Sequence, residues 1–202
     1  MRAPQHRSGQ SGFSMIEVLV SLLIIVFGLL GLLGLQARAQ IAELESYQRG
    51  QALILVQDMV SRINANRKAA GCYVTGTINT TDLTLGTGFS GTPACVAGAG
   101  TVATRAVADI DIAAWHNALL GTSETKGGAS VGSVVGARGC VTYDAATATY
   151  RVAVAWQGMA PTKSPSAVDA LAICGVNKYH SAGGSDALRR EVNISLRMAN
   201  LL

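Results

Sequence analysis

The sequence predicts an α+β fold, in which a long N-terminal helix packs on a mainly antiparallel sheet of about four strands. Three observations lead to this fold class. Residues 18–35 form an apolar run with neither a charge nor a proline. An amphipathic stretch with helical spacing continues from it to Lys68. Nearer the C-terminus, apolar residues alternate with small or polar ones in residues 150–157 and 190–198, which is the period of a half-buried strand.

The apolar run is long enough to cross a membrane. A helix from residue 13 to residue 37 would extend roughly 37 Å at about 1.5 Å per residue, and the hydrocarbon core of a bilayer is about 30 Å thick. Arg2 and Arg7 precede this segment, and Arg38 is the first charge after it. The positive-inside rule therefore predicts a single span, with the N-terminus in the cytoplasm and everything after Arg38 exported.

A polar leader, residues 1–12, precedes the apolar run and ends in Gly12. This order is the reverse of an ordinary secretory signal, in which the cleavage site follows the apolar region. With the sequence GFSMIEVLV that starts at Gly12, the arrangement resembles the class III signal of type IV pilins and the related pseudopilins. The resemblance implies a type IV pilin-like fold. It also implies that a prepilin peptidase cuts after Gly12 in the cytoplasm and methylates the new amino group of Phe13.

The resemblance extends beyond the signal. Residues 46–67 and the small β-rich tail are similar to the minor pilins. This implies a protein that is first anchored in the bacterial inner membrane and then helps to initiate a type IV pilus and to form its tip. The implied partners are other minor pilins, the major pilin, the prepilin peptidase, the inner-membrane assembly machinery and, as a further candidate, a tip adhesin.

Glu17 is the one charged residue between Phe13 and Ala37. A carboxylate inside a membrane-spanning helix costs on the order of 2.5–3.5 kcal/mol on insertion, and such residues usually have a partner and a function. A free N-terminal ammonium is the natural partner. The resemblance implies that Glu17 neutralises the amino group of a neighbouring subunit's Phe13 during assembly, in preference to a position among the lipid headgroups with no partner.

The helix is expected to run from about residue 14 to residue 66. Residues 13–37 would form its transmembrane or filament-core half, and residues 38–68 its amphipathic half. Apolar residues in the second half recur at steps near three and four and so share one face; they are Ile41, Leu44, Ala52, Leu55, Met59 and Ile63. Because such a face needs a sheet to cover it, residues 69–202 are expected to form a periplasmic globular head.

All four cysteines, Cys72, Cys95, Cys140 and Cys174, follow the predicted span. Disulfides persist on the exported side, and an even number of cysteines there implies pairing. No CxxC spacing indicates a zinc site. Of the three possible connectivities we expect Cys72 with Cys95, which bracket one Thr/Gly-rich segment. We expect Cys140 with Cys174, which share the outer face of two predicted strands.

Between the long helix and the sheet, residues 69–104 are rich in Thr, Gly and Ala and are expected to form an irregular connector. A short helix should follow, capped by Asp109 or Asp111 and ended by Gly121. Trp115 in this helix is expected in the core.

Four strands are predicted in the C-terminal part of the chain. Residues 140–144 and 150–157 should form a hairpin, and residues 169–174 and 190–198 should supply the other two strands. In the last of these, alternate residues point to one side; they are Val192, Ile194, Leu196 and Met198.

Composition and motifs argue against catalysis and against nucleic-acid binding. The net charge of +4 comes from scattered Lys and Arg residues that form no basic stripe. His116 is one of only three histidines and is expected to be a surface or packing residue, so we expect no metal and no cofactor. No GxSxG elbow, phosphate loop or paired carboxylates stand out. The chain is therefore not expected to be an enzyme.

Two further functions remain open from the sequence. One is a minor pseudopilin of a type II secretion system, and the other is a membrane-anchored binding module or enzyme that uses a pilin-type export signal. Loss of a pilin gene would remove pili, whereas loss of a pseudopilin gene would remove secreted enzymes.

Overall fold

The computed structural model describes residues 12–77, 84–95, 100–130, 132–180 and 186–198. It confirms the predicted α+β class, with a long N-terminal helix and a mainly antiparallel sheet. The predicted leader lies outside the described residues except for Gly12. The chain divides into two compact units, Met1–Glu43 and Leu44–Leu202.

Helix α1 spans Met15–Ala65, close to the range expected from the sequence. Its residues as far as Leu44 are exposed, and its buried side chains are those of Ala52, Val56, Met59 and Ile63. The predicted apolar face is therefore correct for three of these residues, but it is wrong for Ile41 and Leu44, which are 42% and 49% exposed. Periodicity defines a helix face, but it does not show how far along that face the sheet reaches.

The main sheet has the strand order β1-β5-β6-β7, and β2 pairs with β5 beside β1. Strands β5 (Arg138–Asp144), β6 (Thr149–Gln157) and β7 (Arg189–Arg197) are long and antiparallel, so the predicted hairpin and the predicted last strand are confirmed. The other two strands are short; β1 (Gly76–Thr77) runs parallel to β5, and β2 (Leu85–Gly86) runs antiparallel to it.

The predicted strand at residues 169–174 is wrong, because this segment forms turns. The Asp169 carboxylate accepts a hydrogen bond from the amide of Leu171 at 2.9 Å, and the Asp169 carbonyl accepts one from the amide of Ala172. Such local bonds compete with strand pairing. The guanidinium of Arg189 then holds the carbonyl oxygens of Ala172 and Cys174. The fourth strand of the sheet path is therefore β1.

Helix α2 spans Val102–Leu120 and is longer than expected. Its N-cap is Thr101, whose hydroxyl accepts from the amide of Thr104 while the hydroxyl of Thr104 accepts from the amide of Thr101. The predicted Asp109 or Asp111 cap is therefore wrong. Gly121 ends the helix as expected, in the left-handed conformation with φ of 69°.

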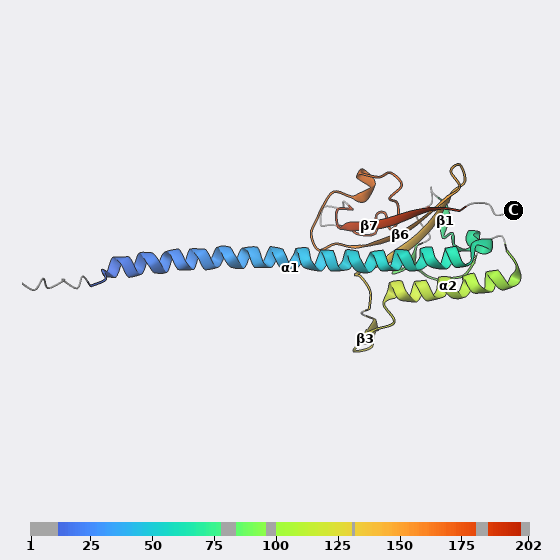
Figure 1. Ribbon diagram of the computed structural model, residues 1–202. Helices are drawn as coiled ribbons and strands as arrows, with labels where there is room; N and C mark the ends of the chain where they lie inside the picture. Colours follow the sequence, from blue (N-terminus) through green and yellow to red (C-terminus); the bar gives the residue numbers. More distant parts are fainter. Residues whose placement is uncertain (1–11, 78–83, 96–99, 131, 181–185, 199–202) are drawn as a thin grey trace, which may run out of the picture. The chain divides into compact units, whose positions relative to one another are not determined.

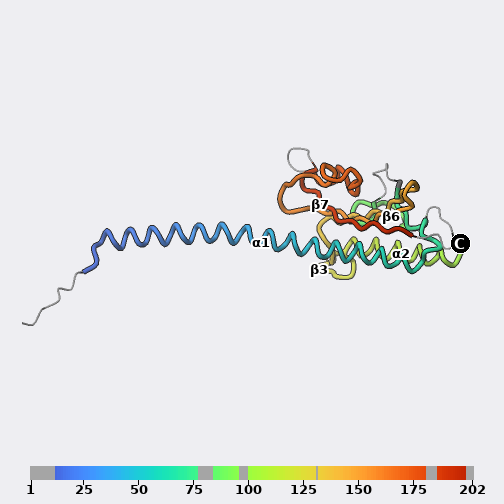
Figure 2. The backbone as a smooth tube through the Cα atoms, turned by 45° about the horizontal axis from the view of Figure 1, so that its top comes forward, coloured from blue at the N-terminus to red at the C-terminus, as the bar shows by residue number. Residues whose placement is uncertain are grey.

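The core lies on one face of the sheet, where α1 and α2 pack side by side (Figures 1 and 2). Val152, Val154 and Trp156 of β6 face the helices, and Trp115 of α2 is fully buried among them, as predicted. Burying one large apolar side chain contributes roughly 1.5–3 kcal/mol. The opposite face carries a smaller cluster that includes Cys140, Ala153, Ala155, Cys174 and Tyr179.

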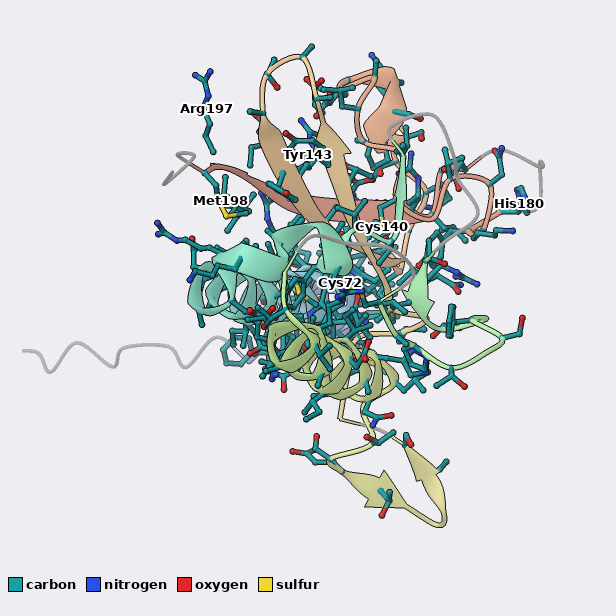
Figure 3. The ribbon with its side chains drawn as sticks, turned by 90° about the vertical axis from the view of Figure 1, so that its right-hand side faces the viewer. Cys72, Cys140, Tyr143, His180, Arg197 and Met198 are labelled. Carbon is teal, nitrogen blue, oxygen red and sulfur yellow. A yellow bond between two sulfur atoms is a disulfide. The ribbon has the colours of Figure 1, made fainter. Side chains whose placement is uncertain are left out.

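Two 3₁₀ helices and two short strands complete the described part of the second unit. The 3₁₀ helices are η1 (Arg67–Tyr73) and η2 (Pro165–Ala167). Strands β3 (Thr125–Lys126) and β4 (Ala129–Ser130) form a separate exposed hairpin. This hairpin projects on the side of α2 away from the sheet (Figures 1 and 3).

Candidate processing and assembly site

The peptide bond between Gly12 and Phe13 lies outside helix α1. Residues 12–14 are not helical, and the Ser14 carbonyl accepts the first helical hydrogen bonds, from the amides of Glu17 at 3.0 Å and Val18 at 3.3 Å. The Phe13 side chain is 84% exposed. Exposed non-helical segments near chain ends are the usual sites of proteolysis. The geometry at Gly12 is therefore compatible with cleavage there.

Glu17 lies in the first turn of α1, four positions after Phe13. An acidic side chain is favourable at this end of a helix because the helix dipole is positive there. Glu17 takes part in none of the ion pairs found among residues 12–77, 84–95, 100–130, 132–180 and 186–198.

Helix α1 is, by length and composition, able to cross a membrane. Its most apolar window has a mean hydropathy of 2.9, and no part of that window is buried inside the structure. It begins near the N-terminus, so Gly12, Phe13 and Glu17 lie at the N-terminal end of this apolar segment.

Both predicted disulfides are present in the second unit. Cys72 of η1 is joined to Cys95, with the Cα atoms 4.6 Å apart, and Cys140 of β5 is joined to Cys174, with the Cα atoms 5.7 Å apart. The labelled Cys72 and Cys140 lie in different parts of this unit, the first beside the helices and the second on the sheet (Figure 3). The first bridge closes the Thr/Gly-rich connector, and the second holds the turns that follow η2 against the sheet.

A polar network joins α1, η1 and α2. Arg62 pairs with Asp58 and Asp111, each at 2.9 Å, and the hydroxyl of Tyr73 donates to Asp111 at 2.6 Å. Asn66 donates to the hydroxyl of Tyr73 and to the carbonyl of Thr104. Burial, together with the hydrogen bond to Asp111, raises the pKa of Tyr73, so its hydroxyl stays protonated as a donor. Each of these groups has a partner within the network. Asp111 does not cap α2; it accepts hydrogen bonds from Arg62 and Tyr73 and so links the three helices.

His116 is a packing residue, as expected. Its Nδ1 atom accepts from the amide of Gly86 at 3.0 Å, and its ring lies edge-on to Phe89, with the centroids 5.3 Å apart. Burial lowers the pKa of His116, which keeps the ring neutral and able to accept. Within the described ranges, no three His, Cys, Asp or Glu side chains are grouped as metal ligands would be.

A buried charge cluster on β7 was not anticipated from the sequence. Arg189 is fully buried and pairs with Asp186 and Glu191, whose side chains are 8% and 1% exposed. One guanidinium faces two carboxylates, and burial raises the pKa of Glu191 to about 7 against the attraction of Arg189. The sequence did contain a signal for this cluster: Arg189 and Glu191 have opposite charges and are two positions apart, so they share one face of a strand.

Comparison with known families gives two matches that adjoin along the chain. The prokaryotic N-terminal methylation motif matches residues 7–33, which include Gly12, Phe13 and Glu17. The family described as type IV pilin Tt1218 matches residues 34–113, which include the second half of α1 and most of α2. No curated protein and no solved structure matches the chain.

Proposed function

We propose that this chain, in which residues 34–113 match a type IV pilin family model and residues 7–33 match the N-terminal methylation motif, is a minor pilin that helps to initiate a type IV pilus and forms part of its tip. Within this proposal, the resemblance of residues 46–67 and the β-rich tail points to the minor pilin called PilV. The observation that carries the proposal is the place of Glu17, a carboxylate in the first turn of an exposed apolar helix, within the methylation motif and with no ion-pair partner among the described residues.

In this proposal each part of the chain has a separate task. Residues 1–12 are the leader, which prepilin peptidase removes before the amino group of Phe13 is methylated. Residues 13–37 anchor the protein in the inner membrane, with the N-terminus cytoplasmic, and later enter the filament core. Residues 38–68 connect this segment to the sheet, and residues 69–202 form the periplasmic head.

Glu17 would act when the protein leaves the bilayer. Removal of the leader creates an ammonium on Phe13, and a second subunit entering the filament would bring its own ammonium close to Glu17. In the low-dielectric core of a filament an unpaired carboxylate is strongly unfavourable, whereas a paired one is tolerated. The ion pair between Glu17 and the neighbouring ammonium therefore favours the one axial offset between adjacent helices at which these two charges meet.

Two features of the head support a minor pilin exposed at the tip. The disulfides Cys72–Cys95 and Cys140–Cys174 brace a domain with several irregular segments. The small β3–β4 hairpin is exposed and extends beyond α2, where it is accessible to other minor pilins, to the major pilin or to an adhesin.

The test compares Glu17→Ala with Glu43→Ala, which removes an exposed carboxylate from the same helix beyond the apolar run. Glu17→Ala should be cleaved, inserted and disulfide-bonded normally, because removing a charge from the span makes insertion easier. It should be lost from sheared filaments, with fewer pili per cell, while Glu43→Ala behaves as wild type. Normal recovery of Glu17→Ala in filaments would contradict the assembly role.

Deletion of the gene separates a pilin from a pseudopilin. The proposal expects loss of surface pili with secretion of exoenzymes unchanged. Loss of exoenzyme secretion with pili intact would instead assign the protein to a type II secretion system.

A further inference from the structure

The second unit has an open groove where α1 ends. Helix α1 ends at Ala65, and the groove lies between this end and the helix-facing side of the β5–β6 hairpin. The groove has a volume of about 860 Å³. It is bounded by the end of α1 and by η1 on one side, and by Tyr143, Tyr150 and Met198 of the sheet region on the other.

The floor of the groove is aromatic. Tyr143 of β5 and Tyr150 of β6 are paired directly across the hairpin. Their ring centroids are 4.5 Å apart, with the planes tilted by 40°. Tyr143 is 37% exposed, while Tyr150 and Met198 pack partly against the main core. The floor is therefore a fixed apolar surface with phenol hydroxyl groups as hydrogen-bond donors.

The rim of the groove is cationic. Arg67 and Lys68 of η1 and Arg197 of β7 all line it and are all exposed, and the lining contains no acidic residue. Figure 3 shows the side chain of Arg197 extending outward at the end of β7. In the part of the chain that the structure describes, none of these three cations pairs with a carboxylate.

This lack of partners contrasts with the better-buried arginines of the same unit. Arg62, Arg151, Arg189 and Arg190 each pair with a carboxylate of the chain. At the groove, positive charge collects beside an apolar floor, and no carboxylate of the described residues pairs with it. Surfaces of this kind are complementary to an anionic partner with apolar parts.

We propose that this groove binds an extended acidic segment of a partner protein. Carboxylates of the segment would form charge-assisted hydrogen bonds with Arg67 and Lys68, and the methylene groups of its side chains would lie on Tyr143 and Tyr150. The binding uses only the second unit, so it is independent of whether the assembled filament is a pilus or a secretion pseudopilus.

The tyrosine pair favours a peptide over a single-stranded nucleic acid. Proteins that bind single strands stack bases on open aromatic faces. Here the rings of Tyr143 and Tyr150 pack on each other at 4.5 Å, so no base fits between them. An aliphatic chain needs only the remaining apolar surface.

The test measures binding of fluorescein-labelled hexaglutamate to the full-length protein in detergent, by fluorescence anisotropy at about 50 mM salt, where exposed charges are little screened. Labelled hexaglutamine and an oligothymidylate of the same charge are the comparison probes. The groove variant is Arg67→Gln/Lys68→Gln. The control is Arg49→Gln/Lys163→Gln, which removes the same charge from exposed sites that do not line the groove.

The expected result is that hexaglutamate binds and hexaglutamine does not. The groove variant should weaken hexaglutamate binding about tenfold, since it removes two exposed charge pairs, and the control should change it by less than about twofold. No binding of hexaglutamate to the wild type, or equal weakening by both variants, would overturn the proposal. Tighter binding of oligothymidylate that is lost in the groove variant would assign the groove to nucleic acid.

Discussion

The indole nitrogen of Trp115 lies 2.8 Å from the backbone carbonyl oxygen of Leu55 and donates a hydrogen bond to it. This bond fastens α2 to the backbone of α1 across the main core. The ring of Trp115 is fully buried, so its polar atom and its apolar surface both hold the two helices together.

Trp115→Phe should lower the free energy of unfolding by more than the loss of one hydrogen bond, which is about 1 kcal/mol, because the smaller ring also leaves a cavity. Trp156→Phe is the matched control, since Trp156 is equally buried but its indole nitrogen has no partner among the described residues. Denaturant unfolding, followed by the fluorescence of the remaining tryptophan, should show the larger loss for Trp115→Phe. Equal losses would mean that the bond to Leu55 contributes nothing.

Gly139→Ala should displace α2 from the sheet. A Cβ atom at Gly139 would overlap the Trp115 ring and the Leu119 side chain. Overpacking of this kind typically costs about 1–3 kcal/mol. Gly50→Ala is the control: its Cβ would meet nothing within 4 Å, and it should stabilise α1 by up to about 1 kcal/mol. Thermal unfolding should therefore shift in opposite directions, and unchanged stability of Gly139→Ala would contradict the close packing at β5.

Stability should fall as the pH rises from about 4.5 to about 7, because of Glu191. Burial raises the pKa of Glu191 from 4.5 in the unfolded chain to about 7 in the folded protein. Between these values the unfolded state has lost the proton that the folded state keeps, which costs up to about 1.4 kcal/mol per pH unit. The contribution of protonated Glu191 to stability is complete below its pKa in the unfolded chain. It is lost as the pH rises through its pKa in the folded protein.

The measurement is the free energy of unfolding at several pH values for wild type, Glu191→Gln and Glu124→Gln. Glu191→Gln should flatten the decline over this window, whereas Glu124→Gln, in the exposed hairpin region, should keep it. A decline that persists in Glu191→Gln would place its origin in another group.

Intact mass should show that the mature protein starts at N-methylated Phe13. The bond after Gly12 is exposed and non-helical, and Gly12 is the small residue on the leader side of the cut. Gly12→Val should leave the leader in place and the amino group of Phe13 unavailable. A wild-type protein that begins at Met1, or one cut after the apolar run, would overturn the assignment of the signal.

The elements predicted correctly are those in which one periodicity runs over many residues. Helix α1, β6 and β7 are of this kind. Errors arose where side chains bond to the local backbone: Thr101 and Thr104 cap α2 earlier than Asp109 would, and Asp169 folds a strand-like segment into turns. Of the candidate functional residues, Glu17 was evident because its charge interrupts an apolar run. The groove beside Tyr143 was not evident from the sequence, since it depends on where α1 ends relative to the sheet.

The burial of one stretch of α1 within the main core has a mechanical consequence. Ala52, Val56, Met59 and Ile63 pack against the sheet over three turns of one continuous helix. Tension applied along α1 is therefore transmitted to the sheet as shear, distributed over several side-chain contacts loaded in parallel. No single linker bears the load, so the sheet and the helix should resist pulling as one body, with the two disulfides limiting how far the remaining loops can extend.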